Sequence, residues 1–148
     1  MMKTKTISIY KMLKYDEAKV ELVKKIEFKR PVRIAAVCGT ISSFPTLHVQ
    51  LTLRLKEHEN GGWVHQFKED DNIIAVMNCG DSAVGRLALA PIDIVTNVVY
   101  FYYWAHNMTH LFVSNLPIIG WIIKRFMKQI TWKDFHGSYI IFYEEIGE

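Results

Sequence analysis

Two histidines, His106 and His110, have the spacing of a pair of metal ligands. Residues four apart share one face of a helix, so both rings could reach one ion. A zinc peptidase would carry Glu after the first His as its base, and Asn107 stands there instead. The candidates for a third ligand are His136, Cys79 and Asp81. Because spacing selects none of them, ordinary side chains at the polar end of an aromatic helix are the favoured interpretation. A metal site is the alternative, and no cofactor is expected.

A row of polar side chains on one predicted strand could line a pocket. The row consists of His48, Gln50, Thr52 and Arg54, which alternate with leucine and valine. Any half-buried antiparallel strand has such a polar face whatever its function, so a solvated face is the favoured interpretation. The alternative is a ligand-binding wall with His48 and Arg54, in a small-molecule-binding protein or enzyme. Its pocket would lie between the sheet and the helices.

The remaining motifs do not support catalysis. The glycine-flanked segment 80–85 lacks both the dinucleotide-binding fingerprint and the Walker lysine, so helix capping by Asp81 or Ser82 explains it. Cys38 and Cys79 form no CxxC pair and are expected to be buried free thiols. No acid–base or nucleophile arrangement can be assembled from local spacing. We therefore expect a binding function rather than an enzyme.

The N-terminal half is predicted to be a sheet. Alternating or short apolar runs predict strands at 4–13, 32–42, 47–56 and 73–79, and the Asn60-Gly61 turn predicts a returning strand at 63–67. Residues 18–28 fit a helix or a strand, and we favour a strand with an irregularity near Val23 and Lys24. Pro31 is expected to break the chain.

The C-terminal half is predicted to be helical. Apolar blocks with helical spacing predict helices at 83–90, 92–111 and 118–130. Gly137 is expected to make a turn before a final strand at 138–145. The sequence thus predicts a single α+β domain over 1–148. Its antiparallel sheet of meanders and hairpins (1–79) packs against C-terminal helices (81–130), and the final strand completes the domain.

A long uncharged stretch, Ile94–Ile123, follows Asp93 and precedes Lys124 and Arg125. Polar residues and Pro117 interrupt it, so its apolar pieces are shorter than the ~20 residues that a membrane-spanning helix needs. Burial against the sheet is therefore the favoured fate of this stretch, and surface docking is the alternative. The predicted helix at 118–130 combines an apolar stripe with basic residues, a pattern typical of helices that bind anionic lipid.

Composition narrows the function further. The formal charge of +3 is too small to indicate nucleic-acid binding by itself. The basic residues gather in the first third of the chain and directly after the uncharged stretch. The N-terminus has no apolar core of the length of a signal peptide, so a reducing cytoplasmic location, with possible membrane association, is expected.

These observations favour a non-enzymatic intracellular interaction protein. We expect the region 92–130 to dock on a protein partner, on a second copy of the chain or on an anionic membrane surface. The residues expected to form the interaction surface are Tyr102, Tyr103, Trp121, Lys124, Arg125, Phe126 and Lys128.

Overall fold

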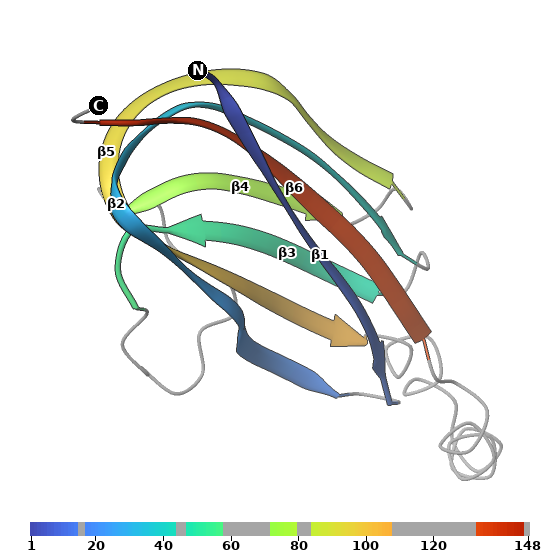
Figure 1. The fold of residues 1–148 in the computed structure, drawn as a ribbon. Helices are drawn as coiled ribbons and strands as arrows, with labels where there is room; N and C mark the ends of the chain where they lie inside the picture. The colour runs from blue at the N-terminus through green and yellow to red at the C-terminus, as the bar shows by residue number, and fades with distance from the viewer. Residues whose placement is uncertain (15–16, 44–46, 58–71, 80–83, 108–132, 147–148) are drawn as a thin grey trace, which may run out of the picture.

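The computed structural model of the chain describes residues 1–14, 17–43, 47–57, 72–79, 84–107 and 133–146. These residues form six strands in one antiparallel sheet (Figure 1). The strands are β1 (Lys3–Leu13), β2 (Ala18–Ser43), β3 (Leu47–Arg54), β4 (Ile73–Cys79), β5 (Val84–Asn107) and β6 (Lys133–Glu145). Their order is β1-β6-β2-β5-β3-β4, so the last strand lies between the first and the second.

The two longest strands, β2 and β5, belong to two layers. Residues 18–27 of β2 pair with 98–106 of β5, and the same part of β5 pairs with β3, which pairs with β4. We call these strands the β3 layer. Residues 32–43 of β2 pair with 84–96 of β5 on one side and with β6 on the other, and β6 pairs with β1. These strands form the β6 layer, so one continuous sheet folds over into a two-layered sandwich.

A bulge marks the passage from one layer to the other. Glu27 pairs with Val98 and Val32 pairs with Thr96, so residues 28–31 of β2 stand opposite Asn97 alone. Extra residues in one strand increase its bend, and Figure 1 shows both strands turning sharply on one side of the molecule. We call this place the bend. Pro31 lies in it, within a continuous strand, so the prediction that Pro31 breaks the strand is wrong. No ladder partner on β5 is lost there, which is why proline is tolerated.

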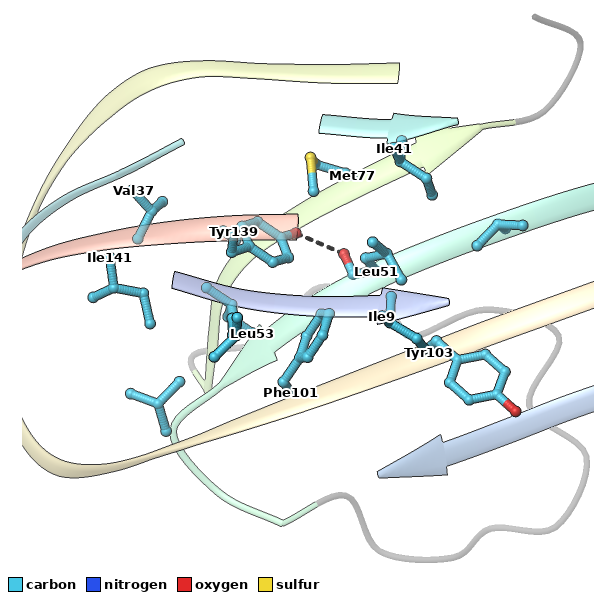
Figure 2. Close-up of a cluster of buried hydrophobic side chains, with 14 of the residues drawn as sticks. Ile9, Val37, Ile41, Leu51, Leu53, Met77, Phe101, Tyr103, Tyr139 and Ile141 are labelled. Atoms are coloured by element: carbon cyan, nitrogen blue, oxygen red, sulfur yellow. Dashed lines mark hydrogen bonds between the residues drawn. The ribbon is translucent and has the colours of Figure 1, made fainter. Parts of the chain in front are cut away.

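The core lies between the two layers. Phe101 of the β3 layer packs edge-on against Tyr139 of the β6 layer, with 5.7 Å between the ring centroids. The Tyr139 hydroxyl donates a hydrogen bond of 2.7 Å to the carbonyl oxygen of Leu51, across the interior (Figure 2). Tyr139, Phe101 and Leu51 are all fully buried. This bond satisfies a phenol that would otherwise be unpaired in an apolar core.

Gly137 lies in the middle of β6, so the predicted turn at this residue is wrong and the final strand begins at Lys133 rather than at residue 138. A Cβ atom on Gly137 would lie 2.5 Å from the Leu51 Cδ1 atom and 3.0 Å from the Thr40 carbonyl oxygen. Glycine therefore lets the Leu51 side chain of the opposite layer approach the β6 backbone.

The predicted α+β fold class is wrong, because the part of the chain that the structure describes is all-β. Residues 84–107, predicted to be the helices 83–90 and 92–111, form β5 instead. The physical reason is that β5 is apolar on both faces. Its inward Phe101 and Tyr103 alternate with outward Tyr102 and Trp104, which form a second buried cluster. Continuous apolar runs of this kind hide the two-residue period of a strand. The amphipathic helix predicted at 118–130 lies outside the described residues.

Several strand predictions are confirmed. The segments at 4–13, 32–42 and 73–79 are strands, and the segment at 47–56 is a strand as far as Arg54. Residues 18–28 are also a strand, and the expected irregularity is the register shift between Leu22 and Lys24. The predicted turn at 60–61 and the returning strand at 63–67 lie outside the described residues. Antiparallel pairing holds throughout.

Candidate functional site

The outer face of the β3 layer brings several of the predicted site residues together. His48 of β3 stands opposite His106 of β5, and Arg54 stands opposite Tyr100. Tyr102 shares this outer face, whereas Tyr103 points into the core and donates a hydrogen bond of 2.8 Å to Glu21 Oε2. The other expected site residues, His110, Trp121, Lys124, Arg125, Phe126 and Lys128, lie outside the described residues.

The polar row on this face is not solvated as expected. Gln50, Thr52 and Arg54 are each at most 5% exposed. Gln50 Nε2 donates to Asn78 Oδ1 at 3.0 Å, and Arg54 Nε donates to the Lys56 carbonyl oxygen at 3.3 Å. Tyr102 stands opposite Thr52 in the register, and Trp104 stands opposite Gln50. The row therefore packs among aromatic rings.

A metal site does not emerge from the residues that the structure describes. His48 and His106 are neighbours, but no group of three or more His, Cys, Asp or Glu side chains in the described ranges could hold an ion. Cys38 is half-buried, and Cys79 is buried beside Ser43, with 3.1 Å between Sγ and Oγ. Both cysteines are free thiols.

Two hollows of the described surface lie at the bend. One, with a volume of about 290 Å³, is bounded by the end of β6, by β1 and by the bend of β2. We call it the bend groove. Its lining residues are Lys5, Ile26, Glu27, Phe28, Lys29, Arg30, Val32, Tyr143 and Glu145. A second hollow of about 330 Å³ lies beside Tyr100 and is lined by Lys25, Glu27, Phe28, Asn97, Val98 and Tyr100. Glu27 and Phe28 line both.

Basic residues predominate around these hollows. We call Lys5, Lys25, Lys29 and Arg30 the basic bend. Lys25 pairs with Glu27 at 2.8 Å and lies 5.7 Å from the centroid of the Tyr100 ring. The hydrogen bond to Glu27 and the charge of this carboxylate raise the pKa of the Lys25 ammonium, so Lys25 remains a cation at neutral pH. In the described part of the chain, Lys5, Lys29 and Arg30 have no acidic side chain within ion-pair distance.

The two carboxylates of the bend groove are already paired with lysines. Glu145 Oε1 accepts a hydrogen bond of 2.7 Å from Lys3 Nζ, and Glu27 is the partner of Lys25. Their negative charge is therefore balanced by cations that do not line the bend groove. The cations that do line it, Lys5, Lys29 and Arg30, are left to attract an anion.

The sequence shows that basic residues gather in the first third of the chain, but it does not show that they share one groove. Lys5 belongs to β1 and Lys29 to β2, and β6 lies between these two strands. The groove forms because β6 pairs between β1 and β2 and brings residues of all three strands together. The charge bias was the available signal, and the topology was the missing information.

Comparisons with known proteins add no family. No family model matches the chain, and no curated protein matches it. A chain in the structure of infectious bursal disease virus, Gx strain, aligns over 100% of this chain with 9% sequence identity and a TM-score of 0.42. The aligned region is 33% of the length of the viral chain. This similarity is too low to support an argument about function.

Proposed function

We propose that this is a non-enzymatic interaction protein that docks on an anionic membrane surface through the basic bend. The observation that carries the proposal is that Lys5, Lys29 and Arg30 line one hollow without acidic partners in the described part of the chain. In the described ranges, no helix is long and apolar enough to span a bilayer. The proposed association is peripheral, through cations at the protein surface.

The expected strength follows from the number of cations. Each Lys or Arg near an anionic bilayer contributes about 1 kcal/mol, and the attraction fades within a Debye length of about 8 Å at physiological salt. Lys5, Lys29 and Arg30 are not paired with carboxylates, so about 3 kcal/mol is available from them at most. Weak, salt-sensitive binding is the consequence.

Co-sedimentation with vesicles tests the proposal. Wild-type protein should bind vesicles of phosphatidylcholine with roughly a third phosphatidylserine, and binding should fall steeply as salt is raised. The double variant Lys29→Glu/Arg30→Glu should lose this binding, because it reverses two of the cations that line the groove. Pure phosphatidylcholine vesicles should bind neither form.

A second double variant serves as a matched control. Lys11→Glu/Arg86→Glu changes the net charge by the same amount, at two exposed residues. In the register, these residues pair with Phe135 and Thr40, near the ends of β6 and β2 that lie away from the bend. Equal loss of vesicle binding in both double variants would mean that net charge, and not the bend, is responsible. Absence of binding by the wild type would refute docking itself.

Self-association is a second candidate, favoured by a different observation. Val84, Leu89 and Val95 of β5 are each more than half exposed. Exposed apolar side chains that gather on one element are typical of protein interfaces. Light scattering coupled to size exclusion would detect a dimer, and Leu89→Glu should return it to a monomer. A wild-type monomer at every concentration tested would exclude this candidate.

A further inference from the structure

We infer that the bend groove is a binding site for a phosphomonoester group. The inference rests on the proposed function, because both use Lys29 and Arg30, and it adds the chemical identity of the anion. The same phosphomonoester could be carried by a lipid headgroup such as that of phosphatidic acid or by a small soluble metabolite. The shared chemistry is a dianionic phosphate with several acceptor oxygens.

The charge at the groove fits a dianion better than a carboxylate. Lys5 comes from β1, and Lys29 and Arg30 come from the bulge of β2, so the cations reach the hollow from two strands. A phosphomonoester carries between about −1.5 and −2 charges at neutral pH and offers three acceptor oxygens. A carboxylate carries one charge and could engage the Arg30 guanidinium but would leave the lysines without a full counter-charge.

The apolar floor strengthens this attraction. Ile26 and Val32 are buried where they line the groove, and Phe28 packs against Tyr143 with 4.9 Å between ring centroids. Charges interact more strongly next to such a low-dielectric wall than in open water. Tyr143 also brings a hydroxyl to the lining, and it has no hydrogen-bond partner in the part of the chain that is described. This hydroxyl can donate a hydrogen bond to a phosphate oxygen.

The size of the groove sets the size of the ligand. At about 290 Å³ it lies just below the range of small-molecule sites, which is roughly 300 to 1,000 Å³. A phosphate ester with a small attached group fits this volume. A lipid would therefore enter with its headgroup and leave its acyl chains in the bilayer.

The experiment compares lipid and soluble phosphates on the same variants. Vesicles with phosphatidic acid are set against vesicles with phosphatidylserine, matched for surface potential, so that only the monoester differs. In parallel, inorganic phosphate and glycerol 3-phosphate are titrated into the protein and followed by the backbone amide shifts of residues 26–30 and 32. Wild type should prefer phosphatidic acid by about 3-fold to 10-fold, in line with one or two charge-assisted hydrogen bonds at a partly exposed site.

Two variants and a control locate the site. Lys5→Met keeps the length of the side chain and removes a cation that lines the bend groove but not the second hollow, so it should abolish the preference. Tyr143→Phe should reduce the preference by a smaller factor. Lys11→Met removes an exposed cation of β1 that does not line the bend groove and should leave the preference unchanged. Amide spectra of each variant verify that it is folded.

Each outcome separates this inference from the docking proposal. Equal binding to both vesicle types, with no saturable response to soluble phosphates, overturns the phosphomonoester site and leaves docking standing. Saturable binding of glycerol 3-phosphate without vesicle binding supports the site with a soluble ligand and refutes docking. If Lys11→Met abolishes the preference as completely as Lys5→Met, the effect is general charge and the site is refuted.

Discussion

Replacing Tyr139 by Phe removes one oxygen atom from the interior and leaves the ring in place. The Tyr139 side chain is fully buried and its hydroxyl donates to the Leu51 carbonyl oxygen at 2.7 Å. Burial raises the pKa of this hydroxyl well above that of an exposed tyrosine, so it is a protonated donor at any pH at which the protein is used. The substitution therefore tests one hydrogen bond that joins the two layers.

The cost can be estimated from the groups left behind. A buried hydrogen bond contributes about 0.5 to 1.5 kcal/mol, and a buried acceptor left without its partner costs about 1 to 3 kcal/mol. The phenylalanine ring keeps the edge-on contact with Phe101, so no packing loss is added. We expect Tyr139→Phe to lower the free energy of unfolding by about 1 to 2 kcal/mol. For a chain of 148 residues this corresponds to a fall in Tm of roughly 2 to 8 °C.

A matched control is available on the surface. The Tyr10 hydroxyl donates to Asp134 Oδ2 at 2.8 Å, but Tyr10 is 61% exposed. Tyr10→Phe also deletes a hydrogen-bonded phenol oxygen, and water can replace it, so the loss should be below about 0.5 kcal/mol. Urea denaturation followed by circular dichroism measures both. A neutral Tyr139→Phe, or a Tyr10→Phe that costs as much, would contradict a stabilising role of the buried bond.

Other predictions follow from burial and close contacts. Because burial raises the Tyr139 pKa above the value of about 10 that holds in the unfolded chain, the folded state retains its proton and stability falls as pH rises above about 10. Between pH 8 and pH 11 the wild type should lose about 1.4 kcal/mol more than Tyr139→Phe in urea titrations. Gly85→Ala should cost about 1 to 3 kcal/mol, measured the same way, because a Cβ atom would collide with the Asn78 carbonyl oxygen. A thiol reagent should modify half-buried Cys38 in the native protein and reach Cys79 only upon unfolding.

The sequence predicts some elements of this fold well and others poorly, for one physical reason. Leu51 and Leu53 of β3 alternate with polar Thr52 and Arg54, so a period of two is visible and the strand is predicted correctly. In β5, the residues on the outer face are as apolar as those on the inner face, and the period disappears. Strands of 24 residues are also far longer than usual, so length favours a helix. The high content of Val, Ile, Tyr and Trp in this segment was the signal for a strand.

The candidate site depends on pairing between strands that are far apart in the sequence, and local sequence patterns do not reveal such pairing. Lys29 and Arg30 adjoin Pro31, which suggested only a chain break. Their use in a groove requires a bulge at residues 28–31 and a neighbouring β1, and the pairing of β1 with a strand 130 residues later determines its place. No spacing rule reaches that far. The histidine pair shows the opposite error, because His106 lies on a strand, where the i, i+4 argument does not apply.

The position of β6 between β1 and β2 has a consequence for synthesis. All of β1, from Lys3 to Leu13, pairs with β6. Among the described residues, β1 has no other ladder partner. During translation the first strand therefore stays unpaired until residues 133–145 have emerged from the ribosome, and its core residues Ile7, Ile9 and Leu13 stay exposed. Prolonged exposure of such residues favours binding by chaperones and slow, late completion of the fold. A chain arrested before residue 133 should hold a protease-sensitive N-terminus, and release should protect it.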